Sequence, residues 1–182
     1  MSKRLSQSTF AARRARGFTM VELIVVMVLI GILSAVAAGR FFDRSGFDAE
    51  GFAEQTRALL RYAQKAAIAR NAPVFVQLDD NRIALCYSSP QGNCAPADRV
   101  PAPGGQMGGG ASEAHCQSPG WFCVGRPEGV QFSLSRALTE FSFDALGRPV
   151  AGSGGFDGLS LTIVSAGETR TVSVTQETGY VQ

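Results

Sequence analysis

The 182-residue sequence contains little from which a catalytic site could be built. Its one histidine, His115, lies in a segment rich in Gly, Ser and Cys, so Ser-His-Asp and Cys-His arrangements have little support. Neither the G-x-S-x-G spacing nor the G-x-x-x-x-G-K-[ST] phosphate loop occurs. Asp79-Asp80 is typical of a turn rather than of a general-acid pair. We therefore predict no enzymatic activity, no cofactor and no metal, with an enzyme that uses His115 as the competing interpretation.

Basic residues are scarce after the first 17 positions. Residues 1–17 carry five basic and no acidic side chains, which leaves 12 basic and 15 acidic ones in 18–182, a formal charge of −3. A weakly acidic chain is a poor candidate for binding nucleic acid. Basic residues that precede an apolar run stay on the cytoplasmic side of a membrane, so the rest of the chain should face the opposite side.

The sequence has one apolar run of membrane length, Phe18–Ala38, in which Glu22 is the single charge. As a helix this run is about 31 Å long, which matches a hydrocarbon core. We predict a basic leader over 1–17 and a transmembrane helix over 18–38. Cleavage after Gly17 would leave the apolar helix on the mature protein, whereas an uncleaved signal anchor fits the hydropathy equally well.

Residues 18–71 predict one long helix whose second part, 39–71, is amphipathic. Five apolar residues there share one face: Phe52, Leu59, Leu60, Ala63 and Ala67. Pro73 ends the helix, because it disfavours helical geometry at the residue before it. Strands are predicted at 74–78, 82–87, 122–124, 129–134, 140–143, 159–164, 169–175 and 180–181.

The predicted fold class is α+β, with the long helix packed on an antiparallel β-sheet head over 72–182. Residues 88–120 are rich in Pro, Gly and Ser and predict a long irregular loop, which is a candidate surface for a partner. Trp121 follows this loop, and we expect it to be buried in the head rather than to contact a partner.

Four cysteines lie beyond the apolar run, where disulfides can form: Cys86, Cys94, Cys116 and Cys123. Three pairings are possible and the sequence does not decide among them. We favour Cys86–Cys94 and Cys116–Cys123, since each closes a short loop and would contribute about 2–3 kcal/mol. A zinc site at Cys116 and the adjacent His115 has less support, because the sequence has no C-x-x-C pair.

The segment Arg16-Gly17-Phe18-Thr19-Met20-Val21-Glu22-Leu23 resembles the prepilin processing site of type IV pilins and type II secretion pseudopilins. The resemblance implies that prepilin peptidase cuts after Gly17 and N-methylates Phe18. It also implies that the helix packs with other pilin subunits in a fibre core and that the head is displayed outside. Gly39 stands where many major pilins have a proline, which favours a minor pilin or pseudopilin.

Two C-terminal segments, Phe141–Pro149 and Glu177–Val181, resemble those of GspH/FimT-like minor pilins and, among these, the MshC group of mannose-sensitive haemagglutinin (MSHA) pili. This implies a structural or initiating subunit of a type IV pilus. The alternatives are a type II secretion pseudopilin of the GspH kind and a FimT-like DNA-binding minor pilin. DNA binding has less support, because no Gly-Arg pair here is followed by the second arginine of a Gly-Arg-x-Arg motif and 176–182 contains no basic residue.

Glu22 needs an explanation, because a carboxylate within a membrane helix costs about 3 kcal/mol. One interpretation is that Glu22 lies near the cytoplasmic end of the span and extends to the interface. The other follows from processing: cleavage creates an α-amino group on Phe18, and an ion pair between subunits would offset the desolvation of both charges. Our hypothesis is that Glu22 pairs with the Phe18 amine of an adjacent subunit and sets the axial stagger of assembly.

Overall fold

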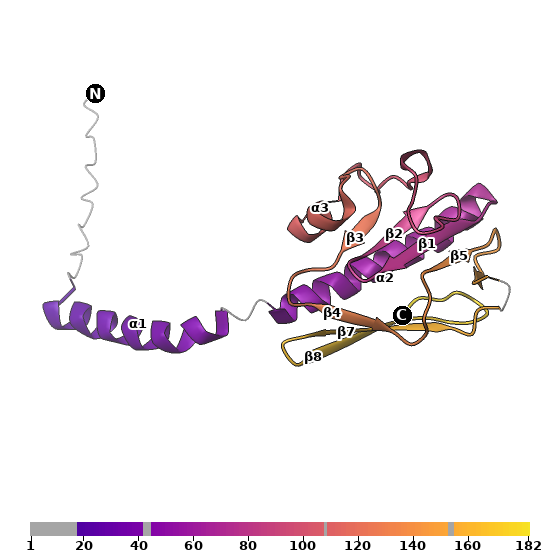
Figure 1. The fold of residues 1–182 in the computed structure, drawn as a ribbon. Coiled ribbons are helices and arrows are strands. Elements are labelled where there is room, and N and C mark those ends of the chain that lie inside the picture. Colours follow the sequence, from indigo (N-terminus) through magenta and orange to yellow (C-terminus); the bar gives the residue numbers. More distant parts are fainter. Residues whose placement is uncertain (1–17, 42–44, 108, 153–154) are drawn as a thin grey trace, which may run out of the picture. The chain divides into compact units, whose positions relative to one another are not determined.

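The computed structural model describes residues 18–41, 45–107, 109–152 and 155–182, with the side chains of 36–46 excepted. The predicted leader, 1–17, therefore lies outside the described residues. The chain divides into two compact units, 1–43 and 44–182, and we call the second unit the head (Figure 1).

The described part of the first unit forms the helix α1 (Met20–Phe41). Every side chain from Phe18 to Ala35 is exposed, and the large apolar ones range from 43% exposed at Val26 to 84% at Met20. In the part of the chain that is described, no helix combines the length and the apolar character needed to cross a membrane. The predicted span over 18–38 is thus not confirmed, and its last three side chains lie outside the described ones.

The head begins with α2 (Ser45–Arg70), so the predicted single helix over 18–71 is observed as two helices. Residues 42–44 between them lie outside the described part, and continuity stays a prediction. All five residues predicted to share the apolar face of 39–71 are buried, at 2% exposure or less. The helix ends as Pro73 predicts: Asn71 has a φ of 49°, and the Ala72 N–H donates to the Ala67 carbonyl at 3.2 Å.

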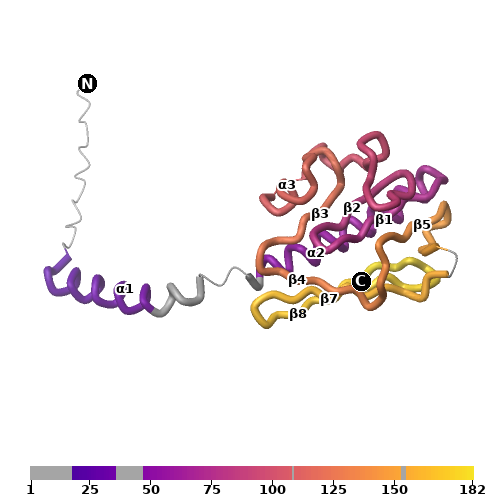
Figure 2. The backbone as a smooth tube through the Cα atoms, in the orientation of Figure 1, coloured from indigo at the N-terminus to yellow at the C-terminus, as the bar shows by residue number. Residues whose placement is uncertain are grey.

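The strands form two antiparallel sheets rather than one. The first sheet has the order β3-β2-β1-β5-β6, with β1 Val74–Asp79, β2 Arg82–Cys86, β3 Cys123–Gly125, β5 Glu140–Phe143 and β6 Pro149–Val150. The second has the order β4-β7-β8, with β4 Gln131–Leu134, β7 Leu159–Ser165 and β8 Glu168–Val174. Both sheets contact α2, and the C-terminal segment joins β8 through the bridge Val174–Val181 (Figures 1 and 2). The α+β prediction is confirmed.

The prediction of an irregular loop over 88–120 is wrong in part. This segment contains the 3-10 helix η1 (Pro96–Asp98) and the helix α3 (Gly110–Cys116). Residues between them continue the first sheet: the Phe122 N–H donates to the Val100 carbonyl at 2.8 Å. The sequence predicts a loop here because glycine, which is frequent in residues 104–110, has a low helix propensity. Packing overrides that propensity, because α3 lies so close to Gly125 that a β-carbon there would collide with the Ala111 backbone.

Candidate functional site

The processing motif leads into the first turn of α1, and Thr19 caps this helix. The Thr19 carbonyl accepts the first helical hydrogen bond from the Leu23 N–H at 3.2 Å. Its hydroxyl Oγ1 accepts a second one from the Glu22 N–H, also at 3.2 Å. Both bonds define Thr19 as the N-cap residue. This role was not predicted from the sequence, although Thr19-x-x-Glu22 is the signature of a capping box.

The N-cap gives Glu22 a role within its own helix. This role is separate from the hypothesis that Glu22 pairs with an adjacent subunit. Its side chain is exposed in the first turn of α1, where a negative charge interacts favourably with the helix dipole. An α-amino group on Phe18 would add positive charge at this same end. The structure thus shows an exposed carboxylate of Glu22 at the positively polarised end of α1. Gly17, the residue that precedes the expected cleavage site, lies outside the described residues.

The four cysteines form two disulfides in the head, Cys86–Cys94 and Cys116–Cys123, with Cα–Cα distances of 6.0 and 5.9 Å. These are the pairings favoured from the short loops. Their sulfur atoms are consequently not available as thiolate ligands for zinc. Within the described ranges, no group of three or more His, Cys, Asp or Glu side chains is arranged to hold a metal ion.

Trp121 lies at the centre of the disulfide region and is 1% exposed, so the prediction that it is buried in the head is confirmed. Its indole Nε1 donates to the Leu85 carbonyl at 2.8 Å. The guanidinium carbons of Arg99 and Arg82 lie 4.4 and 5.1 Å from its ring centroid. These contacts match a cation–π arrangement and mark Trp121 as part of the internal structure of the head.

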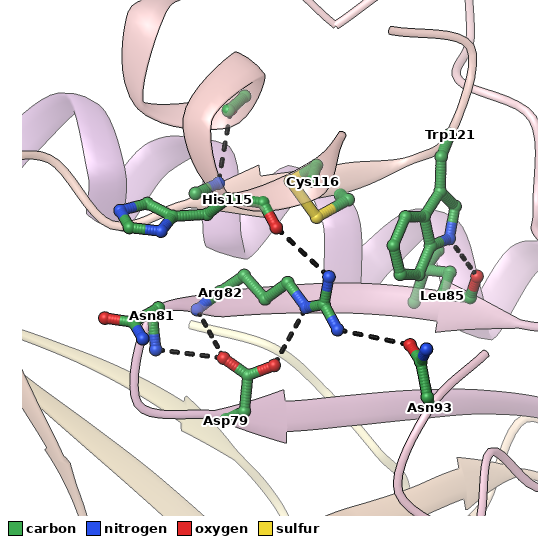
Figure 3. Close-up of a disulfide and its surroundings, with 11 residues drawn as sticks. Asp79, Asn81, Arg82, Leu85, Asn93, His115, Cys116 and Trp121 are labelled. Atoms are coloured by element: carbon green, nitrogen blue, oxygen red, sulfur yellow. Dashed lines mark hydrogen bonds and ion pairs between the residues drawn. A yellow bond between two sulfur atoms is a disulfide. The ribbon is translucent and has the colours of Figure 1, made fainter. Parts of the chain in front are cut away.

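Arg82 connects the loop closed by Cys86–Cys94 to His115, the residue that precedes Cys116 of the second disulfide (Figure 3). Its Nε donates to Asp79 Oδ2 at 2.8 Å, its Nη1 to the His115 carbonyl at 3.0 Å and its Nη2 to Asn93 at 3.3 Å. Asp79 also accepts the backbone N–H groups of Asn81 and Arg82, which confirms its predicted role in a turn. His115 takes part through its backbone carbonyl, so the contacts of this cluster are structural.

The two C-terminal segments that carry the family resemblance meet on one helix. Gln64 of α2 donates from Nε2 to the carbonyls of Gly147 and Thr178, at 2.9 and 2.8 Å. One turn earlier, Arg61 donates from Nε and Nη2 to the Val181 carbonyl at 3.2 and 3.0 Å. No sequence signal pointed to Gln64, because a polar residue on an amphipathic helix is usually solvated.

Glycines allow this close approach. Gly147 and Gly179 have φ angles of 77° and 65°, which favour glycine over residues that carry a β-carbon. A β-carbon on Gly179 would lie 2.7 Å from the Gly147 carbonyl oxygen. The predicted tight turn at 144–149 with a special dihedral at Gly147 is confirmed, as is the final extended segment that pairs with β8 at Val181.

Arg148 pairs within its own turn. Its Nε and Nη2 both lie 3.0 Å from Asp144 Oδ2. Desolvation by itself would raise the pKa of Asp144. The backbone N–H groups of Arg148 and Leu146 and the Arg148 guanidinium outweigh desolvation, so the pKa of Asp144 lies below its usual value. Arg148 thus already has an anionic partner inside the chain.

Comparison with known proteins agrees with this architecture. Residues 12–38 match the prokaryotic N-terminal methylation motif. The type IV narrow pilus major component PilA5 of Thermus thermophilus is 39% identical over 70 residues, which are 37% of this chain and 60% of that relative. The chain thus spans less than two thirds of the length of PilA5.

Two solved structures are similar to the chain. The minor pseudopilin EpsH of the Vibrio cholerae type II secretion system has a TM-score of 0.50 and 14% identity, over 74% of this chain and 94% of EpsH. The type IV minor pilin FimU of Pseudomonas aeruginosa has a TM-score of 0.49 and 16% identity, over 73% of this chain and 90% of FimU. The likeness to EpsH shows the shared pilin fold. Residues 53–179 match the type II transport protein GspH, and since this match covers more than half of the sequence, the chain belongs to the GspH family of the type IV pilin superfamily.

Proposed function

We propose that this chain is a minor pilin that is cut after Gly17 by prepilin peptidase, N-methylated on Phe18 and assembled into a type IV pilus of the MSHA type, in a structural or initiating role. One observation carries the proposal: most of α1 lies within the N-terminal methylation motif matched over residues 12–38, and all of its described side chains are exposed although most are apolar. An apolar helix of this kind needs a covering environment. The inner membrane supplies it before assembly, and other pilin helices supply it in the fibre.

The proposed topology is a single pass, with the N-terminus in the cytoplasm and the head in the periplasm. Two features support it. The five basic residues of 1–17 precede the apolar run, which is the arrangement that keeps a leader cytoplasmic. The two disulfides of the head are typical of an oxidising compartment.

Glu22 is the proposed assembly residue. The N-cap bond from its backbone N–H to Thr19 fixes the first turn of α1 and leaves the carboxylate exposed. A carboxylate held in this way is available to the methylated amine of Phe18 in an adjacent subunit. The pair would form only between chains in register, which would set the stagger of the fibre.

The chain is proposed to have no enzymatic activity, in keeping with pilin and pseudopilin families, which consist of structural subunits. The polar clusters of the head support this. Arg82 is occupied by internal partners, and Arg148 is paired with Asp144. This pairing and the acidic balance of 18–182 also disfavour the DNA-binding alternative, since phosphate contacts need clustered free cations.

A pseudopilin of the type II secretion system is the second candidate, because the fold that the chain shares with EpsH covers 94% of that protein. The C-terminal segments 141–149 and 177–181 favour the MSHA type instead. The two are separated by following the chain in sheared surface fibres of strains that lack either the pilus genes or the secretion genes. We expect the chain to disappear from the fibres only when the pilus genes are deleted. Disappearance only on deletion of the secretion genes would establish the pseudopilin role.

A further inference from the structure

Two exposed apolar side chains, Ile68 and Leu146, lie close together near the end of α2, and we call them the end patch. Leu146 is 72% exposed in the turn that Asp144 caps, and Ile68 is 51% exposed in the last turn of α2. They flank Gly147, since a β-carbon on Gly147 would lie 2.7 Å from Ile68 Cδ1. Neighbouring apolar side chains with this exposure favour a contact surface.

A pocket of about 670 Å³ lies near the other end of α2, and we call it the α2–α3 pocket. It is lined by the first turns of α2 with Phe47 and Phe52, by α3, and by residues 125–129. In Figure 1, α3 lies near the first half of α2, whereas β5, which leads into the Asp144 turn, lies toward the end of α2. From Gly51 in the pocket to Ile68 in the end patch, α2 rises about 26 Å.

Gly51 leaves space on the α2 side of this pocket. Glycine inside a helix is less favourable than alanine, because it loses more conformational freedom on folding. Apart from its chain neighbours and the backbone of α2, no atom lies within 4 Å of the place that a β-carbon on Gly51 would take. Packing within the described chain therefore does not require glycine here. The space is open to a side chain from another molecule.

The α2–α3 pocket carries negative charge. Asp48 and Glu128 line it, both are exposed, and neither takes part in an ion pair among the described residues. Arg126 also lines the pocket, and its guanidinium donates to two backbone carbonyls and an amide oxygen, all of them neutral groups. With His115 neutral, the lining has a formal charge of −1.

A cation lies beside the end patch. Lys65 precedes Ile68 by three positions, so the two side chains are neighbours on the surface of α2. Lys65 is exposed, and in the described part of the chain it forms no ion pair. The end patch thus combines apolar side chains with a lysine, while the pocket combines an apolar lining with unpaired carboxylates. The two surfaces are complementary in shape and charge.

We propose that the end patch of one copy of this chain docks into the α2–α3 pocket of a second copy. Leu146 enters the space beside Gly51, and the Lys65 ammonium approaches the carboxylates of Asp48 and Glu128. Because the contact joins two different surfaces, it links copies head to tail in a row with open ends.

A contact made by two apolar side chains and one cation is weak when the copies diffuse freely. Copies anchored in one membrane through α1 have a higher effective concentration, which favours the contact. In this respect the inference rests on the proposed function, which supplies the anchor.

Chemical cross-linking tests the contact, because Lys65 is the only lysine in residues 18–182. Unlabelled and ¹⁵N-labelled full chains are mixed in phosphatidylcholine vesicles and treated with a carbodiimide, which joins an ammonium to a carboxylate in direct contact. Mass spectrometry of the digest should find amides from Lys65 to Asp48 or Glu128 that combine one labelled and one unlabelled peptide. Within one chain, Lys65 and Asp48 lie about 26 Å apart along α2, too far for this reaction. Absence of both mixed amides would overturn the proposal.

Variants on the two surfaces give an independent test. Leu146→Ser should lower the yield of mixed amides at least about tenfold, whereas Leu146→Met, which keeps an apolar side chain, should stay near the wild type. Gly51→Leu should block the pocket with a similar loss of yield, and Gly51→Ala is its matched control. The fluorescence of buried Trp121 verifies that each variant is folded. Equal yields within each pair of folded variants would contradict the proposal.

The contact and the proposed function can fail separately. A chain that is processed and built into fibres but gives no mixed amide would overturn the contact alone. A chain that gives the mixed amides in vesicles but is absent from fibres would overturn the proposed function and support the contact.

Discussion

Gln64 donates from its side-chain Nε2 to the backbone carbonyl of Gly147, 83 positions along the chain, at 2.9 Å. The same nitrogen reaches the Thr178 carbonyl at 2.8 Å. One amide on α2 thereby holds together the two C-terminal segments from which the family resemblance was drawn. The joint consists of a turn with Gly147, a second turn with Gly179, and the face of α2 that carries Gln64.

Removal of the Gln64 side chain should weaken the head. Gln64→Ala leaves two carbonyls without their donor, and we expect the free energy of unfolding to fall by about 1–2 kcal/mol. Urea unfolding of the full chain in detergent, followed by the fluorescence of Trp121, measures this change. Gln55→Ala is the matched control, because Gln55 is exposed on the same helix and its loss should alter stability by less than about 0.5 kcal/mol. Equal effects of the two substitutions would show that the hydrogen bonds of Gln64 do not stabilise the head.

Gly179 should tolerate alanine far less well than Gly167. Both have positive φ angles, 65° and 83°, so both substitutions carry a backbone cost of about 1 kcal/mol. Only at Gly179 would the new β-carbon meet other atoms: the Gly147 carbonyl oxygen at 2.7 Å and Phe143 Cε1 at 2.9 Å. We expect Gly179→Ala to lose about 3 kcal/mol in all, measured by the same unfolding assay. A loss no larger than that of Gly167→Ala would show that the joint is not tightly packed.

The turn at Asp144 should contribute to the loss of folding stability at acidic pH. Because the pKa of Asp144 is lower in the folded chain than in the unfolded one, its ionised form stabilises the fold at pH values above the unfolded pKa of about 4. That contribution is lost as the pH falls through the folded pKa. Thermal unfolding between about pH 6 and about pH 3 should therefore show a steeper loss of stability in the wild type than in Asp144→Asn. Parallel pH profiles would argue against this role of Asp144.

Much of the head could be predicted from sequence because local signals and packing agree there. The apolar face of α2 at Phe52, Leu59 and Ala63 follows helical spacing, and Asp79 starts a hairpin as its turn chemistry predicts. Short loops between cysteines predicted the pairings that the structure has. Each of these features depends on residues that are close together along the chain.

The features that sequence did not reveal depend on distant contacts. The helix α3 forms at Gly110–Cys116 against local propensity, because the Cys116–Cys123 disulfide and contact with Gly125 hold it. The strands divide into two sheets because β7 pairs with β4 and β8. The alternation of apolar and polar residues along a strand does not determine which other strand it pairs with. Gln64 has the sequence environment of any solvated helical residue. The cap at Thr19 is the exception, since its local Thr-x-x-Glu signature was present.

Charge at Glu22, rather than the shape of its side chain, should control assembly. The N-cap bond uses the Glu22 backbone N–H, so Glu22→Gln preserves the bond while removing the negative charge. We expect incorporation into fibres to fall at least tenfold in Glu22→Gln and less in Glu22→Asp, because loss of one partner leaves a buried charge uncompensated. Quantitative immunoblots of sheared fibres, normalised to total chain, give the ratio. Wild-type incorporation of Glu22→Gln would refute the pairing with Phe18.

We expect the chain to be processed between Gly17 and Phe18 and to be built into a fibre by the helix that follows. The most direct test is the intact mass of the protein recovered from sheared surface fibres of its native host. We expect a chain that starts at Phe18, carries one N-methyl group and lacks the thiol hydrogens of the two disulfides. A chain found in the inner membrane alone, with residues 1–17 still attached, would contradict it and would indicate a signal-anchored periplasmic protein.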